Sequence, residues 1–130
     1  MKKRGLQLLE RVQLHEKAHA KAGSLSYGQQ KLLEIIRAQA TGANLFLLDE
    51  PAAGVNRTML HEIISIIKEL HGSGKTIVIV EHDMGFVMEL SQRVIVMDYG
   101  KEIAEGTPGE IQKNPKVLEA YLGIKNEVLC

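Results

Sequence analysis

The hydrophobic residues of this chain follow two patterns that alternate along the sequence, short continuous runs and a helical period. Short apolar or β-branched runs, too short for helices, occupy residues 45–48, 76–80 and 94–97. Between them, residues 59–70 and 86–90 repeat apolar side chains every three or four positions, which is typical of helices. Nearly continuous apolar strands that alternate with helices are typical of a parallel sheet covered by helices. The pattern therefore predicts an α/β fold.

Two further helices are expected before the first strand. Apolar residues at helical spacing within 6–14 predict a short amphipathic helix that fades by Ala22-Gly23. Ser26 and Gln29 match a capping box, in which each side chain caps the other residue's backbone N–H. A second helix should therefore begin at Ser26 and end near Gly42.

The C-terminal part predicts a hairpin and two short helices. The turn sequence of residues 98–101 is followed by a return strand over residues 102–105, antiparallel to the strand before it. Thr107 precedes a proline, and Glu110 lies three positions after it, which marks a helix start. Pro115 opens the last helix.

Composition narrows the function classes. The chain has 130 residues, a length that suits one domain, with 16 basic and 16 acidic residues and no net charge. This balance argues against a nucleic-acid binder held by a basic field. The single cysteine, Cys130, excludes an internal disulfide and fits a reducing compartment. No apolar run reaches the roughly 18 residues of a membrane span, and the N-terminus lacks the apolar stretch of a secretory signal.

Right-handed crossovers should bring two polar strand ends, Asp49-Glu50 and Glu81-His82, to one edge of the sheet, where ligands bind in open α/β folds. There an aspartate can hold Mg²⁺ and a glutamate can activate water. The helix N-terminus at Ser26 suits a phosphate. Each feature also has an interpretation without function. Asp49-Glu50 could be a solvated strand end, His82 a structural histidine, and Ser26 an ordinary helix cap.

Four segments in order resemble the nucleotide-binding domain of ABC transporters, over about residues 6–123. They correspond to that family's signature motif, Walker B strand, D-loop and switch histidine: Leu25-Ser26-Tyr27-Gly28-Gln29, residues 45–51, Ala53-Gly54-Val55-Asn56, and Glu81-His82-Asp83. The resemblance implies a P-loop NTPase type of fold.

Four finer segments resemble the ATPase subunits of branched-chain amino acid importers: residues 50–56, 81–84, 105–108 and 114–123. Importers of urea, amides and other polar solutes are similar. The resemblance implies partnership with a second ATPase subunit and with integral membrane permease subunits. It also implies a cytoplasmic location, peripheral on the inner face of the cell membrane.

By the resemblance, Ser26, Gly28 and Gln29 contact ATP bound to the partner subunit. Tyr27 stands where the family usually has glycine, so its side chain must point away from the nucleotide.

The resemblance also assigns roles at the sheet edge. Asp49 holds Mg²⁺ through water, Glu50 polarises the attacking water, and His82 contacts the γ-phosphate. Gly54 and Asn56 lie at the dimer interface, and Asn56 replaces the family's common aspartate.

The family's Walker A loop, G-x-x-x-x-G-K-[ST], is absent from these residues. The segment Gly72–Thr76 follows a helix and precedes a strand, the reverse of a P-loop, so we interpret it as a turn. The chain thus resembles the C-terminal portion of an ATPase domain. Residues 1–42 form the end of the helical subdomain with the signature helix, and residues 43–130 form the core and tail.

Two expectations follow for the isolated chain. Without a phosphate cradle it should not hydrolyse ATP. The alternative function is non-enzymatic: a truncated or split chain that self-associates as a homo-oligomer. An unpaired strand edge and an exposed part of the Ile63–Ile67 stripe would drive that association.

One rival motif points to different chemistry. His15-Glu16-Lys17-Ala18-His19 matches H-E-x-x-H, in which two histidines one helical turn apart bind zinc and the glutamate acts as a base. Its surroundings are charged and no third ligand is obvious, so we favour the ATPase interpretation.

Overall fold

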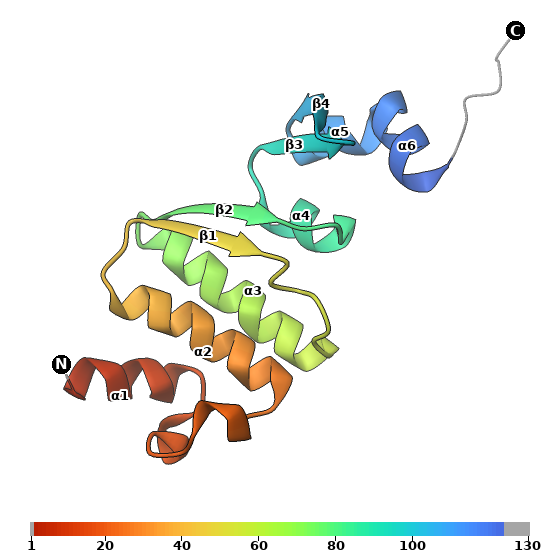
Figure 1. The fold of residues 1–130 in the computed structure, drawn as a ribbon. Helices are drawn as coiled ribbons and strands as arrows, with labels where there is room; N and C mark the ends of the chain where they lie inside the picture. The colour runs from red at the N-terminus through yellow and green to blue at the C-terminus, as the bar shows by residue number, and fades with distance from the viewer. Residues whose placement is uncertain (1, 124–130) are drawn as a thin grey trace, which may run out of the picture. The chain divides into compact units, whose positions relative to one another are not determined.

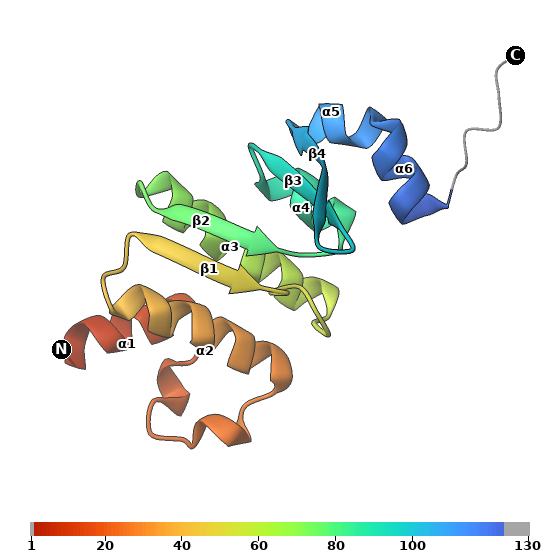
Figure 2. The same cartoon turned by 45° about the horizontal axis from the view of Figure 1, so that its top comes forward.

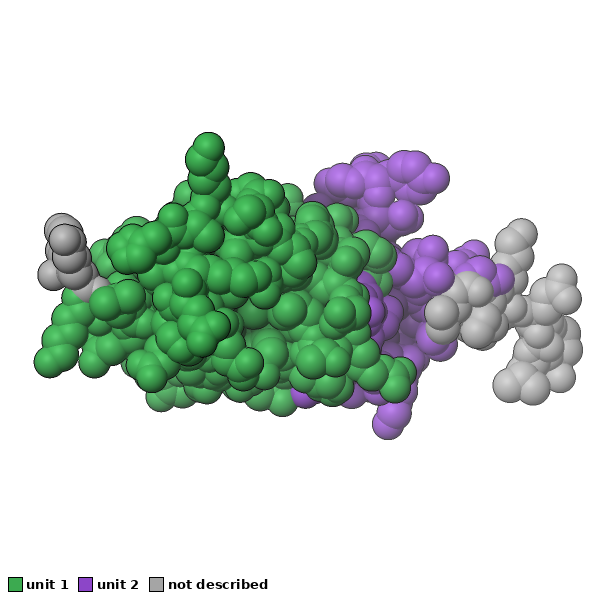
Figure 3. Space-filling model, turned by 90° about the horizontal axis from the view of Figure 1, so that it is seen from below, with its two compact units in different colours: residues 1–82 green, residues 83–130 purple. Residues whose placement is uncertain are grey.

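The strands pair into two separate two-stranded sheets in a computed structural model that describes residues 2–123. Each sheet belongs to one of two compact units, Met1–His82 and Asp83–Cys130, which Figure 3 colours green and purple. The predicted alternation of helices and strands is confirmed over the described residues, and so is the C-terminal hairpin.

The first unit is a parallel strand pair covered by helices. The two strands pair without a bulge, from Leu45 opposite Thr76 to Asp49 opposite Val80. Helices α2 and α3 lie on the same side of this sheet (Figures 1 and 2), with α3 packed on β2. The elements are α1 (Lys2–Arg11), 3-10 turns at His15–Lys17 and Ala22–Ser24, α2 (Tyr27–Ala40), β1 (Leu45–Asp49), α3 (Arg57–Gly72) and β2 (Thr76–Val80).

Helix α1 is shorter than its hydrophobic period suggests. We expected the helix to fade by Ala22-Gly23, but it ends at Arg11. Gln13 has a φ of 56°, in the left-handed region that ends helices. Val12 and Leu14 continue the apolar period and are buried in the turn, which is why sequence periodicity overestimated the helix.

The α3 stripe forms the core of this unit. Ile63, Ile64, Ile66 and Ile67 are all buried, so our expectation that part of this stripe is exposed is wrong. The reason is that α3 is flanked by both α2 and the sheet.

The exposed apolar surface lies on the sheet instead. Successive side chains of a strand point to opposite faces, and the helices cover one face here. Phe46 on the covered face is 3% exposed, whereas Leu47 is 73% exposed. The apolar residues of this open face are Leu45, Leu47, Val78 and Val80. Both strands are where the sequence predicts them, but they are not buried on both faces.

The second unit is built on an antiparallel hairpin. Strand β3 pairs with β4, with an irregularity between Val96 and Met97. Tyr99 and Gly100, the two loop residues, both have positive φ, as a type I′ turn requires. The elements are α4 (Met84–Leu90), β3 (Val94–Asp98), β4 (Lys101–Gly106), α5 (Pro108–Lys113) and α6 (Pro115–Leu122).

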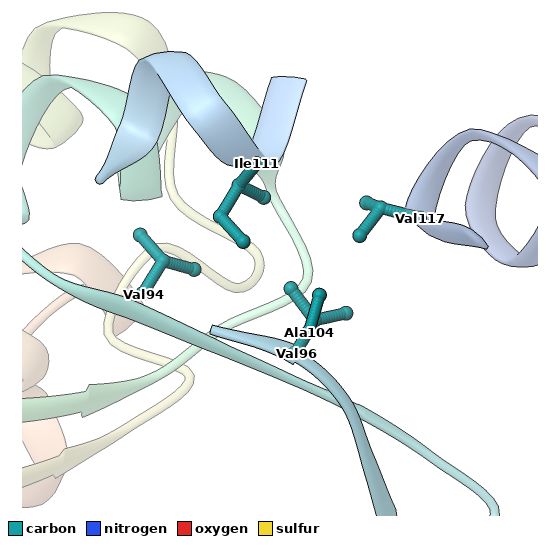
Figure 4. Close-up of a cluster of buried hydrophobic side chains, with 5 residues drawn as sticks. All are labelled: Val94, Val96, Ala104, Ile111 and Val117. Carbon is teal, nitrogen blue, oxygen red and sulfur yellow. The ribbon is translucent and has the colours of Figure 1, made fainter. Parts of the chain in front are cut away.

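Helices α5 and α6 close a small core over this hairpin (Figure 4). Ile111 and Val117 are buried against strand residues, the cluster being Val94, Val96, Ala104, Ile111 and Val117. The predicted helix starts are confirmed: Thr107 and Glu110 form a capping box, and Asn114 caps α6 by accepting from the Lys116 N–H. Among the described helices, none is long and apolar enough to cross a membrane.

Candidate functional site

The carboxyl ends of β1 and β2 meet at one edge of the sheet, as predicted. The Glu50 N–H donates to the Val80 carbonyl at 2.8 Å, which continues the strand pairing one residue beyond β1. Past this point His82 Nδ1 lies 3.5 Å from Glu50 Oε1. Two residues 32 positions apart in the chain, each selected from the sequence, are therefore neighbours.

Glu50 has an unusual backbone conformation. Its φ is 46°, in the left-handed region that residues other than glycine, asparagine and aspartate rarely adopt. Its carbonyl accepts from the Ala53 N–H at 3.1 Å, which folds residues 50–53 into a turn. Its side chain is 55% exposed. Strained backbone that presents an accessible carboxylate is a common property of functional sites.

Asp49 lies on the open face of the sheet. It is the last residue of β1 and is exposed, and strand alternation places it on the same face as Leu47. Mg²⁺ in nucleotide sites commonly takes one or two carboxylates together with water and substrate phosphates. A single accessible aspartate at the sheet edge fits this donor set. No group of three potential metal ligands occurs among the described residues. The fit of Asp49 to Mg²⁺ therefore depends on further ligands from water and from the phosphates of a nucleotide.

Glu81 is a site residue to which the sequence analysis gave no role. Its side chain is 1% exposed. Oε2 accepts from the Ala52 N–H and Oε1 accepts from the His82 N–H, both at 3.0 Å. The signal that could have found it is alternation: Glu81 follows Ile77 and Ile79 on the covered side of β2.

The predicted capping box at the start of α2 is confirmed. Ser26 Oγ accepts from the Gln29 N–H at 3.3 Å, and Gln29 Oε1 accepts from the Ser26 N–H at 3.1 Å. Gln29 Oε1 also accepts from Lys17 Nζ at 3.2 Å. Both polar side chains expected to contact a nucleotide thus hold the first turn of the helix in this structure.

Two glycines allow close approaches around this helix start. A Cβ on Gly28 would lie 2.5 Å from Met59 Cγ, so glycine lets the first turn of α2 approach α3. Gly54 has a φ of 70°, and a Cβ there would lie 3.0 Å from Tyr27 Cε1. The Tyr27 ring therefore lies against Gly54, with Lys31 Nζ 5.6 Å from its centroid.

Asn56 has a local role in this structure. Its side chain accepts from the Met59 N–H at 2.9 Å and caps α3. An N-cap of this kind stabilises a helix by about 1 kcal/mol, which is sufficient to explain an asparagine here.

The H-E-x-x-H segment lacks the helix that zinc binding needs. Residues His15–Lys17 form a single 3-10 turn, so the two histidines do not lie one α-helical turn apart on a regular helix.

Comparison with known proteins bears directly on this arrangement. Residues 1–53 match the family described as ABC transporter, and residues 101–124 match the one described as branched-chain amino acid ATP-binding cassette transporter. The high-affinity branched-chain amino acid transport ATP-binding protein LivG of Salmonella typhimurium is 46% identical over 116 residues. The match covers 88% of this chain and 46% of LivG. Over most of its length the chain is therefore similar to the ATP-binding cassettes of ABC transporters.

Other cassettes extend the match. BraF of Pseudomonas aeruginosa, a high-affinity branched-chain amino acid transport ATP-binding protein, is 43% identical over 116 residues, with the same shares of the two chains, 88% and 46%. A crystal structure of a nucleotide-free ATP-binding cassette from an ABC transporter superposes with a TM-score of 0.83 at 36% identity. It covers 94% of this chain and 50% of the other. The chain thus spans about half the length of the relatives it matches.

Proposed function

We propose that this chain supplies the residues that take part in hydrolysis, at the carboxyl ends of β1 and β2, in an ATP-hydrolysing subunit of an ABC importer. The observation that carries the proposal is the proximity of Glu50 and His82, 3.5 Å apart at the ends of adjacent parallel strands. The similarity to ABC transporter cassettes suggests the chemistry of this pair, since hydrolysis of a bound nucleotide needs an activated water and stabilised phosphate charge.

Each residue at the edge has a separate task in this proposal. Glu50 takes a hydrogen bond from the attacking water and aligns it, which an exposed carboxylate on a turn can do. His82 donates toward the γ-phosphate and stabilises the charge that develops there. Asp49 would hold Mg²⁺ through water, and the ion would supply positive charge that neutralises the phosphates.

The start of α2 serves the other nucleotide of a two-subunit assembly. Its first N–H groups and its positive dipole end favour an anion. Ser26, Gly28 and Gln29 would face ATP bound to a second ATPase subunit, with Gly54 and Asn56 at the interface between the subunits. The capping box supports this by fixing the N–H groups of the first turn in place.

Branched-chain amino acids are the solute class we propose. The support is the match of residues 101–124 together with the similarity to LivG and BraF, both named as branched-chain amino acid transport proteins. In such an importer the chain would act at the cytoplasmic face of the membrane, bound to integral permease subunits.

By itself the 130-residue chain should not turn over Mg-ATP. The printed sequence holds no Walker A loop, so no backbone cradle or lysine binds the β- and γ-phosphates. Turnover of the purified chain clearly above that of its Glu50→Gln variant would contradict this.

A chimera tests the role of Glu50. We would join this chain to the Walker A half of LivG and measure Mg-ATP hydrolysis and nucleotide binding. Glu50→Gln should abolish turnover while leaving binding intact, because it removes the water-aligning carboxylate at constant size. The matched control is Glu34→Gln, at an exposed glutamate of α2, which should hydrolyse at the parent rate. Normal turnover by the Glu50→Gln chimera would refute the assignment.

The open sheet face favours a second candidate function, a non-enzymatic chain that self-associates. Leu45, Leu47, Val78 and Val80 form a contiguous apolar surface beside an unpaired strand edge of the described sheet. Such edges and patches promote pairing with another chain. Sedimentation at micromolar concentration should show a homo-oligomer that Leu47→Lys weakens and Lys101→Ala, in β4, does not. A monomeric parent chain would exclude it.

A further inference from the structure

Glu81 is the buried acid of the candidate site, and the proposed mechanism leaves it without a task. Its side chain is 1% exposed, compared with 55% for Glu50 and 72% for His82. Burying a carboxylate costs free energy unless hydrogen bonds compensate. The partners of Glu81 should therefore explain its position.

Those partners come from two different loops. Oε2 accepts from the N–H of Ala52, in the turn that follows Glu50. Oε1 accepts from the N–H of His82, immediately after β2. One carboxylate therefore connects the backbone beyond β1 to the backbone beyond β2. It does so between the two residues whose proximity defines the site.

The same carboxylate also faces the imidazole. Glu81 Oε1 lies 3.3 Å from His82 Nδ1, and Glu50 Oε1 lies 3.5 Å from the same nitrogen. A carboxylate oxygen can only accept, so these neighbours favour the imidazole tautomer with its proton on Nδ1. The other ring nitrogen, Nε2, then remains for a ligand. Carboxylates that orient a histidine in this way tune many functional sites.

We propose that Glu81 is a positioning residue. It fixes the turn at Ala52 relative to His82 and holds the imidazole in the Nδ1-protonated tautomer. Its importance for hydrolysis rests on the proposed function, but the arrangement itself involves no nucleotide and can be tested without one.

The test is nuclear magnetic resonance of the 130-residue chain. In the parent chain, the imidazole ¹⁵N resonances of neutral His82 should report the proton on Nδ1. In Glu81→Gln, the amide offers one acceptor oxygen and a donating NH₂ where the two backbone N–H groups and the imidazole Nδ1–H need acceptors. The Nδ1–H population should fall, and the Ala52 amide should exchange hydrogen about tenfold faster. The Val78 amide, inside the strand ladder, should be unchanged.

Glu34→Gln is the matched control and should alter neither signal. A neutral His82 in the parent chain that carries its proton mainly on Nε2 would overturn the proposal, whether or not Glu81→Gln folds. So would a folded Glu81→Gln chain with unchanged tautomer and Ala52 exchange. An inactive chimera with the expected tautomer would count against the proposed function and leave the role of Glu81 standing.

Discussion

Each unit contains a two-stranded sheet, but the two sheets differ in strand direction and in how their strands are connected. In the first, β1 and β2 are parallel, so they must be joined by a crossover, and α3 is that crossover. In the second, β3 and β4 form a hairpin with a two-residue loop and carry their own core with α5 and α6. All predicted chemistry belongs to the parallel unit. Its strands end side by side, so polar residues from distant parts of the sequence gather at one edge.

The capping boxes of the two units make the same contrast on a smaller scale. Both begin a helix with reciprocal hydrogen bonds between side chains and backbone. The box of the first unit uses the neutral Gln29, whereas that of the second uses the ionisable Glu110. The local geometry is shared, but only the second box should respond to pH.

The largest effects should come from the two cores. Ile63 is fully buried in the first unit and Ile111 is 1% exposed in the second, so each change to alanine should cost about 2–5 kcal/mol of stability. Urea denaturation followed by amide hydrogen exchange in β2 and in β4 measures each unit separately. Lys101→Ala, at an exposed position of β4, is the control and should change stability by less than about 0.5 kcal/mol. A large loss in this variant would mean that the measurement does not separate core positions from surface positions.

Removing each helix cap should have a smaller effect. Ser26→Ala and Thr107→Ala should each destabilise their own unit by about 1 kcal/mol, since each leaves a first-turn N–H without its acceptor. The same exchange measurement reports both. Glycine at either position should cost only a few tenths of a kcal/mol. Unchanged stability in both alanine variants would show that the side-chain hydrogen bond is not what stabilises the helix start.

The smallest effect should be the pH response of the second box. Hydrogen bonds from the backbone N–H and the hydroxyl of Thr107 hold the pKa of Glu110 below its ordinary value of 4.5. Because the folded pKa is the lower one, the stabilisation is present above the unfolded pKa and is lost as pH falls through the folded pKa. Carboxyl titration by nuclear magnetic resonance should show that the pKa of Glu110 lies below the ordinary glutamate value of 4.5.

Exchanging the two residues sharpens this test. Glu110→Gln should remove the acid-dependent loosening of α5, and Gln29→Glu should introduce one at α2. Unchanged acid behaviour in both variants would mean that the boxes do not control these helix starts.

Local signals predicted much of the fold. The capping boxes, the hairpin turn and the strands depend on residues a few positions apart, and the structure confirms them. The Glu50–His82 pair was predicted too, because chain topology alone brings parallel strand ends together. What failed depends on distant contacts: the burial of the Ile63–Ile67 stripe and the open face of β1 and β2. Apolar side chains on both faces of a strand do not reveal which face is covered.

The end of α1 and the role of Glu81 were missed for related reasons. Val12 and Leu14 maintain the helical period while Gln13 turns the chain, so periodicity alone cannot locate the break. Glu81 needed two observations together, its place on the covered side of β2 and the approach of the Ala52 turn. Only the first of these can be read from the sequence.

The position of Asp49 on the open sheet face links assembly to solvent access. Leu47 and Val80 lie on the same face, with Val80 directly opposite Asp49 in the strand register. A protein layer that covers these two apolar side chains would also lie close to the aspartate. That layer would replace bulk water around the carboxylate and strengthen its attraction for a cation. The affinity of Asp49 for a metal ion would then report how much of the open sheet face is covered by protein.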